Sequence, residues 1–405
     1  MNKVFKVIWN HATQTWTAVS ELGHAKGKTK SKKIVKLTAL AGAVMGSLVA
    51  SQTAMAASDL TTNNAVNIAP NNVPNPTAGS EAVAVGPNAG ATHQHSIAIG
   101  RNATANWTNT ISIGKDTVST KDHAVAIGTS ANASGIQAVT VGSYARTDAN
   151  SSIALGQEAK VTGEAATAAV ALGYKAEASA ANTVAAGKSA TATVDNAVAL
   201  GVSSSATNRN AAALGAYSKA AGDRATAVGA ASKAEGAASF AGGTSAKAIG
   251  KNSIAIGGAT EMDDDYIQDG KQTTAHAAKA NAERSVAIGF NATTTELAAD
   301  SVVMGTNSFS NASASIAIGN SATAKDNISI AIGDKANANS TSAIALGANA
   351  SASGISIGGN SVSSDYESIA LGHDAESLGS QSVAIGNAAK SAQDISFAVA
   401  LGGGR

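Results

Sequence analysis

The chain lacks cysteine and is poor in aromatic and charged residues. Its 405 residues include no cysteine, which excludes disulfide bridges, zinc-thiolate sites and thiol nucleophiles. Aromatic residues make up 3% and charged residues 14% of the chain, against about 25% charged residues in an average globular domain. Because bulky side chains fill wide cores, a chain this poor in them favours a thin fold.

Proline is rare and confined to one stretch. The four prolines lie between Pro70 and Pro87, so residues 88–405 are free of the residue that cannot donate to a β ladder. Glycine, in contrast, accounts for 41 residues. This distribution favours long, continuous β-sheet.

The first 56 residues have the features of an export signal. Six lysines lie between Lys26 and Lys36, and the uncharged run from Leu37 to Ala50 is too short to span a bilayer comfortably. Ala54 and Ala56 flank Met55 in the small-x-small pattern that signal peptidase requires, so cleavage is predicted before Ala57. We divide this leader into 1–25 and 26–56. The alternative is an amphipathic N-terminal helix that stays attached.

Removal of the leader changes the sign of the net charge. The leader holds eight Lys and one Glu, which leaves 20 basic and 26 acidic residues and a net charge of −6. A mildly acidic chain with evenly distributed charge has no electrostatic footprint for nucleic acid or anionic lipid. We therefore expect no nucleic-acid partner.

The mature chain repeats one pentad, of which Ser96–Gly100 and Ala124–Gly128 are examples. We count 22 pentads, with final glycines from Gly86 to Gly402 and a usual spacing of 14 residues. The other spacings are 17 (Gly156 to Gly173), 32 (Gly257 to Gly289), 16 (Gly289 to Gly305), 11 (Gly347 to Gly358) and 16 (Gly386 to Gly402). A weaker element, such as Ala103 and Ala105, follows each pentad. Each repeat therefore contains two short segments.

The spacing of the large residues makes these segments strands. Within a pentad they fall at i and i+2, which is one face of a strand but opposite sides of a helix. A glycine in every period would also cost a helix about 1 kcal/mol each time. A coiled coil is thereby excluded, and an all-β fold is predicted: a parallel β-roll, or β-solenoid, of 14-residue coils with two strands each.

Such a narrow roll has room inside only for Ala, Ser and Gly, so the large residues must point outward. Stacked coils then form a continuous apolar stripe, larger than a soluble monomer tolerates, and we predict that it is the core of an oligomer. At ~4.8 Å per coil the rod is about 100 Å long. The predicted stripe comprises Ile97, Ile99, Ile111, Ile113, Val125, Ile127, Ile153, Leu155, Ile254, Ile256, Ile316, Ile318, Ile330, Ile332, Ile369, Leu371, Val383 and Ile385. The predicted turn glycines are Gly86, Gly100, Gly114, Gly128, Gly142, Gly156, Gly319, Gly333, Gly347, Gly372 and Gly386.

One stretch of the stripe carries smaller residues. From Thr183 to Gly243 the outward pairs include Val184/Ala186 and Ala212/Leu214. Each lost methylene is worth roughly 0.8 kcal/mol. We predict that this segment opens first.

Two features resemble a known family. Met1–Asn10 and Gln14–Leu22 resemble the extended signal peptide region of large exported proteins of Gram-negative bacteria, and the pentads resemble the YadA-like head of trimeric autotransporter adhesins. The resemblance implies a left-handed parallel roll, a homotrimer, display on the outer surface of the cell, and attachment to host extracellular matrix, host cells or other bacteria. It assigns residues 80–405 to the head, with an insertion at about 258–284, after a Pro/Asn-rich segment at 57–79.

The sequence departs from the family pattern at its C-terminal end. It stops within the repeats at Leu401–Arg405, with no neck, heptad stalk or alternating membrane-strand block. We expect an incomplete gene product that cannot anchor itself, periplasmic or secreted when alone. A naturally secreted head is the alternative.

Residues suited to chemistry are few. The carboxylates in 261–270 suggest calcium, but Ile267 occupies a ligand position and no bidentate Glu follows, so a solvated loop is expected. His93 and His95 share a strand face without a third ligand, and Trp107 is expected to fill a turn rather than bind a ligand. No catalytic motif stands in a fitting context, so neither an enzyme nor a cofactor is expected. Besides adhesion, a structural or self-associating rod and, last, ice binding remain as alternatives.

Overall fold

The computed structural model describes residues 5–10, 15–20, 65–69, 74–259, 276–393 and 395–402. The chain divides into two compact units. In the first, β1 (Phe5–Asn10) and β2 (Thr15–Ser20) form an antiparallel hairpin in which Trp9 is opposite Trp16. The predicted cleavage site at Ala54, Ala56 and Ala57 lies outside the described residues.

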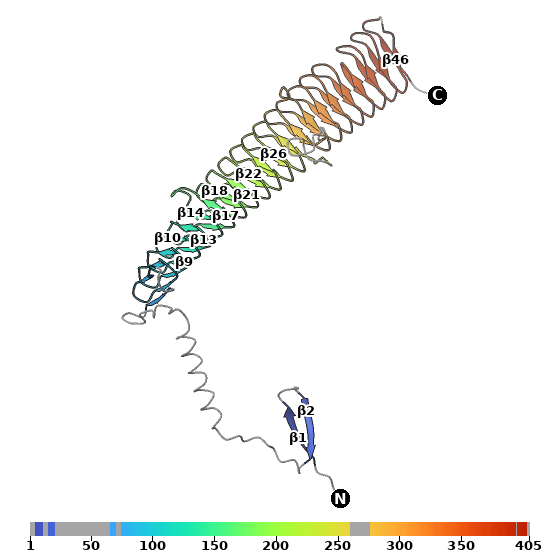
Figure 1. The fold of residues 1–405 in the computed structure, drawn as a ribbon. Coiled ribbons are helices and arrows are strands. Elements are labelled where there is room, and N and C mark those ends of the chain that lie inside the picture. Colours follow the sequence, from blue (N-terminus) through green and yellow to red (C-terminus); the bar gives the residue numbers. More distant parts are fainter. Residues whose placement is uncertain are drawn as a thin grey trace, which may run out of the picture. The chain divides into compact units, whose positions relative to one another are not determined.

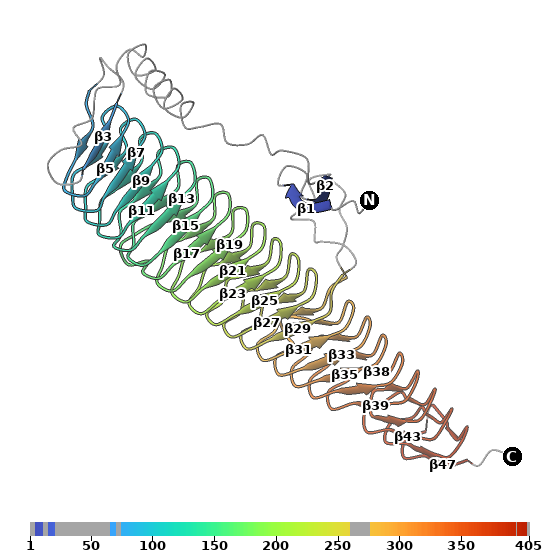
Figure 2. The same ribbon diagram turned by 90° about the horizontal axis from the view of Figure 1, so that it is seen from below.

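The second unit is a parallel β-solenoid whose coils each contribute one odd-numbered and one even-numbered strand (Figure 1). Each strand pairs with the equivalent strands of the preceding and following coils, as in Val125↔Val139 and Asn132↔Arg146. Two parallel sheets result, and Figure 2 shows the odd-numbered one running along the rod from β3 to β47.

The odd-numbered strands of the solenoid have three residues each, and from β5 onward they carry the pentads. They are β3 (Val66–Ile68), β5 (Val83–Val85), β7 (Ile97–Ile99), β9 (Ile111–Ile113), β11 (Val125–Ile127), β13 (Val139–Val141), β15 (Ile153–Leu155), β17 (Val170–Leu172), β19 (Val184–Ala186), β21 (Val198–Leu200), β23 (Ala212–Leu214), β25 (Thr226–Val228), β27 (Phe240–Gly242), β29 (Ile254–Ile256), β31 (Val286–Ile288), β33 (Val302–Met304), β35 (Ile316–Ile318), β37 (Ile330–Ile332), β39 (Ile344–Leu346), β41 (Ile355–Ile357), β43 (Ile369–Leu371), β45 (Val383–Ile385) and β47 (Val399–Leu401).

The even-numbered strands have two residues each. They are β4 (Thr77–Ala78), β6 (Gly90–Ala91), β8 (Thr104–Ala105), β10 (Val118–Ser119), β12 (Asn132–Ala133), β14 (Arg146–Thr147), β16 (Lys160–Val161), β18 (Glu177–Ala178), β20 (Thr191–Ala192), β22 (Ser205–Ala206), β24 (Lys219–Ala220), β26 (Lys233–Ala234), β28 (Lys247–Ala248), β30 (Lys279–Ala280), β32 (Thr293–Thr294), β34 (Phe309–Ser310), β36 (Thr323–Ala324), β38 (Asn337–Ala338), β40 (Ser351–Ala352), β42 (Val362–Ser363), β44 (Glu376–Ser377) and β46 (Lys390–Ser391).

The predicted all-β parallel solenoid is confirmed, and every pentad forms a strand of the odd-numbered sheet, from β5 to β47. The solenoid begins before residue 80, however, because β3 pairs with β5 and β4 with β6. The repeat pattern of the sequence does not predict the first coil, which contains β3, for two reasons. Asn67 occupies the position that is Ala in most pentads, and no glycine closes this strand.

The interior of the roll is filled by small side chains. The central residue of each pentad is fully buried in nearly every coil, as is the second residue of each even-numbered strand. The interior is wider in places than the sequence predicts, since Thr140 and Thr147 fit within one coil and bond to each other at 2.7 Å. Val161 and Val303 are also fully buried. They lie in the coils of 17 and 16 residues, whose strands keep the usual pairing with their neighbours.

Hydroxyl groups close the turns. The hydroxyl of Ser96 donates to the carbonyl of His93 at 2.6 Å, and that of Thr110 donates to Trp107 at the same distance. In the turn between an odd-numbered strand and the next even-numbered strand, the hydroxyl of Ser218 donates to the carbonyl of Gly215 at 2.8 Å. A buried hydroxyl must find a partner, and the turn carbonyl three residues earlier provides it. This explains why Ser or Thr so often precedes the strand.

The pentad glycine is required by two constraints. At Gly142 φ is +141°, which side chains with a Cβ rarely adopt. A Cβ at this position would also come within 2.2 Å, or less than van der Waals contact, of the Gly156 carbonyl oxygen in the next coil. The coils therefore stack at sheet spacing only because the glycines of successive coils face one another.

Candidate interaction surfaces

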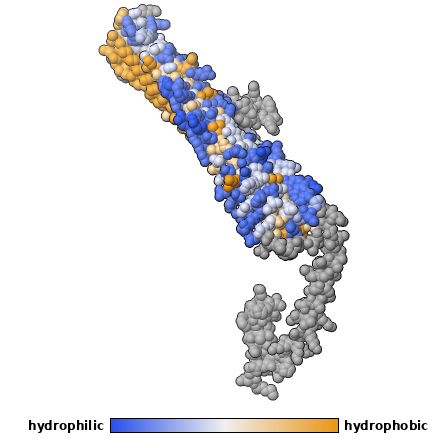
Figure 3. All heavy atoms as spheres, turned by 90° about the vertical axis from the view of Figure 1, so that its left-hand side faces the viewer, coloured by the Kyte–Doolittle hydropathy of each residue, from blue (hydrophilic) through white to orange (hydrophobic). Residues whose placement is uncertain are grey.

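The apolar stripe is the largest feature of the surface. In the single chain, all eighteen predicted stripe residues point away from the interior and none is fully buried, whereas the residue between each pair is. Ile256, for example, is 41% exposed while its neighbour Ala255 is inaccessible. In Figure 3 apolar side chains gather along one side of the rod toward its C-terminal end.

From Thr183 to Gly243 the outward residues of the stripe are smaller, but in one coil of this segment an aromatic ring replaces part of the lost apolar volume. The ring of Phe240 lies over Gly242, so that a Cβ on Gly242 would be only 2.8 Å from Phe240 Cε1. The aromatic ring fills the space that glycine leaves empty in the stripe. The loss of apolar volume is therefore smaller at β27 than the residue types suggest.

The outward face of the even-numbered sheet is mainly polar. Its outward residues are half-buried or exposed and include Thr104, Asn132 and Arg146. The two sheets lie back to back around the interior, so the polar face is opposite the apolar stripe. One face therefore resembles a subunit core and the other a solvated surface.

Trp107 lies in a column of side chains that stack along one turn of the solenoid. The residues 93, 107 and 121 occupy the same turn of successive coils, and the rings of His93 and Trp107 stack at 5.9 Å with an interplanar angle of 7°. The Lys121 ammonium lies 5.5 Å from the centre of the indole. This arrangement supports the turn-filling interpretation. His95 has φ of 56° in a turn and pairs with Glu81 at 2.6 Å, so the two histidines do not share a strand face.

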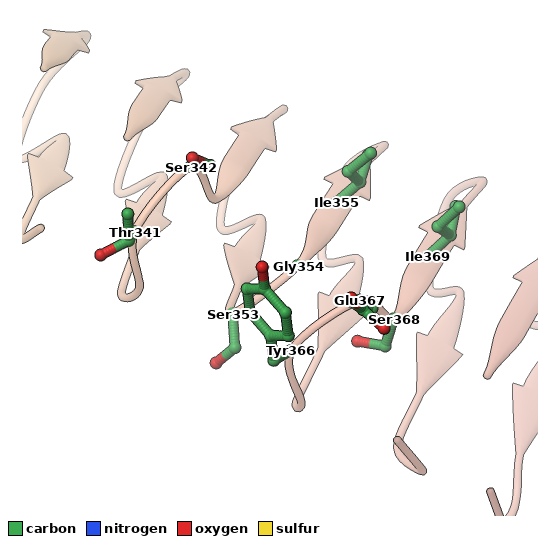
Figure 4. A pocket seen from close by; sticks show the side chains of 9 residues that line it. All are labelled: Thr341, Ser342, Ser353, Gly354, Ile355, Tyr366, Glu367, Ser368 and Ile369. Carbon is green, nitrogen blue, oxygen red and sulfur yellow. The ribbon is translucent and has the colours of Figure 1, made fainter. Parts of the chain in front are cut away.

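A pocket lies at the shortest coil. The 11-residue step omits one turn and leaves an open hollow of about 290 Å³ between the neighbouring turns, bordered by Thr341, Ser353, Gly354 and Glu367. Tyr366, which is 62% exposed, stands beside Gly354 and Ser353 (Figure 4). Ile355 and Ile369 of the apolar face line one side of the pocket. It is therefore continuous with the apolar stripe.

Polar ladders connect the turns of adjacent coils. Asn88 donates to Asn102 at 3.1 Å, and Asn102 donates to Asp116 at 2.7 Å, which lowers the pKa of the Asp116 carboxyl. Arg284 holds Asp300 with two hydrogen bonds of 2.5 and 2.9 Å and lowers its pKa. These groups are exposed, so each pair stabilises the fold only modestly.

The described part of the chain contains no group of three or more His, Asp or Glu side chains that could hold a metal ion. The acidic stretch 261–270, considered above for calcium, lies outside it. Among the same residues, no helix is long and apolar enough to cross a membrane. The geometry thus consists of repeated faces rather than a cleft with convergent reactive groups.

The structure corrects one expectation about charge. Positive charge is not evenly distributed, because Lys219, Lys233, Lys247 and Lys279 occupy equivalent outward positions of β24, β26, β28 and β30. We call these four residues the lysine row. The 14-residue spacing of the first three is visible in the sequence. The fourth comes into line because β30, which follows the insertion in the sequence, pairs with β28.

Comparison with known protein families agrees with this geometry. A model described as the extended signal peptide of the type V secretion system matches residues 1–50. A model described as the YadA head domain repeat (2 copies) matches more than half of the chain, at residues 78–103, 91–117, 108–131, 119–145, 148–169, 165–190, 192–218, 220–246, 276–292, 329–350 and 351–375. A search of curated proteins found no match. With an export signal of this type and head repeats stacked into a parallel solenoid, the chain belongs to the trimeric autotransporter adhesins with YadA-like heads.

Proposed function

We propose that this chain forms a homotrimeric rod on the bacterial surface and attaches the cell to host extracellular matrix, host cells or other bacteria. The observation that supports the proposal most is the apolar stripe, which every coil from β5 to β47 continues. Packing three stripes around an axis removes them from water and leaves the polar sheets outside.

Multivalency explains how such a rod binds without a deep pocket. Three chains present every coil three times, and linked weak contacts raise the overall affinity without a strong single site. The insertion at 258–284 interrupts the repeat, and the turns between the strands lie at the surface, so both are our candidates for determining specificity. Neither the proposed binding nor the fold requires a catalytic group.

Light scattering and solid-phase binding of the exported chain test the proposal. A trimer that binds immobilised collagen, fibronectin or laminin is the expected result, and a monomer would contradict the packing of the stripe. Replacing Ile316 and Ile330 by Lys should dissociate the trimer, because six charges would then be buried at its axis. Matched outward substitutions in the other sheet, Thr323 and Asn337 to Lys, should leave it trimeric.

The regular repeat of the coils also fits a second function, that of a structural or self-associating rod. A rod whose coils only set the distance from the cell, or which associates with its own kind, needs the same stripe but no host ligand. A stable trimer that binds none of the three matrix proteins yet agglutinates cells would favour this alternative.

A further inference from the structure

A ladder of backbone amides runs along the rod in the turns that precede the odd-numbered strands. In each of these turns one residue with a left-handed backbone, such as Asn109, donates its N–H to a carbonyl of the preceding coil, here that of Gln94 at 3.2 Å. The carbonyl of the same peptide group, that of Thr108, accepts from His123 of the following coil at 3.1 Å. From Asn109 to Ile328, every coil adds one peptide group that is bonded on both sides.

The 11-residue coil interrupts this ladder. Its turn is shorter than that of a 14-residue coil, because Gly354 follows Ser353 directly. This coil therefore adds no peptide group to the ladder. Within the described part of the chain, no other protein group bonds the carbonyl of Thr341 on one side or the N–H of Glu367 on the other, and the ladder resumes at Phe397. One acceptor and one donor consequently border the hollow.

The acceptor and the donor are separated by the level of the short coil. The turn with Thr341 leads into β39 and the turn with Glu367 leads into β43, and both strands pair with β41. β39 and β43 are thus two strand spacings apart, which is about 10 Å. One trans secondary amide at the level between them would donate to Thr341 and accept from Glu367, as the peptide group does in every coil from Asn109 to Ile328.

The side chains around the hollow suit a small, uncharged ligand. Ile355 and Ile369 line one side, and the exposed ring of Tyr366 also borders it (Figure 4). The N–H of Tyr366 donates to the Asp365 carboxylate at 2.7 Å, which fixes the turn that carries the ring. Among the described residues that line the hollow, Glu367 alone is charged, so an anionic ligand finds no cation there. The volume of about 290 Å³ is near the lower limit of ligand pockets, about 300 Å³, and so admits one small ligand.

These features favour an acetamido sugar over a peptide. An added peptide strand needs a row of free backbone groups, but the strands beside the hollow are paired on both sides, as β41 is with β39 and β43. An acetamido group brings a single secondary amide, and its methyl group suits the apolar side formed by Ile355 and Ile369. The sugar ring fits against Tyr366, while its hydroxyls suit the polar side chains of Thr341 and Ser353.

From these observations we infer that the hollow at the short coil binds a neutral N-acetylated amino sugar, whose amide completes the ladder between Thr341 and Glu367. This inference rests on the proposed adhesive function and names a ligand class for it. Of the described residues that line the hollow, only Ile355 and Ile369 belong to the odd-numbered strands, so it lies at the border of the apolar stripe and not within it. The proposed trimer presents it three times, which raises the affinity of a weak single site.

Saturation-transfer NMR of the exported chain with three matched trisaccharides tests the inference. Chitotriose carries the acetamido group, N-deacetylated chitotriose has an amine in its place, and cellotriose has a hydroxyl. Only chitotriose should bind, and its acetyl methyl groups should receive the strongest saturation because they contact Ile355 and Ile369. Equal binding of either other sugar would overturn the role of the amide. Binding of N-acetylalanine methylamide, a peptide mimic, as tight as that of chitotriose would reassign the hollow to a peptide.

Two variants remove the site in different ways. Tyr366→Ala should weaken chitotriose binding by about three- to tenfold. The matched control is Tyr144→Ala, which removes a ring of similar exposure, 59% against 62%, from another turn and should bind as the parent does. Inserting a second copy of Ser340–Ser342 between Ser353 and Gly354 restores a 14-residue coil with its own ladder peptide and should abolish binding. Binding that survives in both site variants, or an equal loss in the control, would overturn the inference.

Further measurements on the same variants separate the two proposals. The insertion variant is expected to remain folded, because it gives the short coil the length of most other coils, and hydrogen exchange checks this. A matrix-binding trimer that does not bind chitotriose would overturn the sugar inference alone. A monomer whose chitotriose binding still requires Tyr366 would overturn the proposed trimer alone.

Discussion

Substitution of a pentad glycine tests the stacking of the coils directly. In Gly142→Ala the new Cβ would lie 2.2 Å from the Gly156 carbonyl oxygen, so the oxygen must retreat by about 0.8 Å to reach the 3.0 Å that Cβ contacts respect. Gly156 N donates to the Val141 oxygen at 2.8 Å and the Gly156 oxygen accepts from Ala159 N at 3.2 Å, so a displacement of Gly156 disturbs both hydrogen bonds. The substitution thus strains φ and breaks the ladder together.

The expected cost follows from these two effects. The backbone strain at φ of +141° costs about 1–3 kcal/mol, and one or two lost hydrogen bonds cost about 0.5–1.5 kcal/mol each. Gly142→Ala should therefore destabilise each chain by about 2–6 kcal/mol. Because a solenoid couples mainly nearest neighbours, the damage should be local.

Gly90 provides the matched control. It is the outward residue of β6, it lacks a positive φ, and a Cβ there would meet nothing closer than Thr77 Oγ1 at 3.7 Å. Gly90→Ala should stabilise the chain by about 0.4–1 kcal/mol through the unfolded state. Hydrogen exchange of both variants, read by mass spectrometry coil by coil, is the assay. If the coils around residue 142 exchanged no faster in Gly142→Ala than in the parent chain and in Gly90→Ala, the stacking argument would be refuted.

Three further predictions concern other parts of the rod. Ile328 is a β-branched residue with φ of 60° and is 59% exposed, so Ile328→Asn should stabilise the chain by about 1 kcal/mol, and an unchanged or lower unfolding temperature would contradict this. Arg284 lowers the pKa of Asp300, so their pair stabilises the fold above the ordinary carboxylate pKa and loses this effect as pH falls through the lowered value. Asp300→Asn should accordingly lower the melting temperature at neutral pH and have little effect near pH 2, and an equal deficit at both would argue against the pair. Hydrogen exchange should be fastest within Thr183–Gly243, with β27 the best protected strand there because Phe240 covers Gly242, and a segment protected above the rest of the rod would refute the packing of the stripe.

The sequence alone determined the architecture because each coil repeats the same local demands. A period of 14 residues, large residues at i and i+2, and a closing glycine leave one arrangement: small side chains inside and large ones outside. The scarcity of aromatic residues had already limited the width of the interior. The same regularity led to the apolar stripe, whose role as a subunit core stays a prediction.

Only the tertiary structure decided features that depend on neighbouring coils. The first coil at Val66–Ile68 lacks the motif and is defined by its pairing with β5. Val161 and Val303 occupy inward positions of the two sheets and are fully buried although most equivalent residues are Ala, and the hollow beside Tyr366 exists because its coil is shorter. Lys279 joins the lysine row across an insertion that interrupts the sequence period. Local sequence sets what one coil prefers, whereas the contacts between coils decide which side chains meet, because those contacts join residues far apart along the chain.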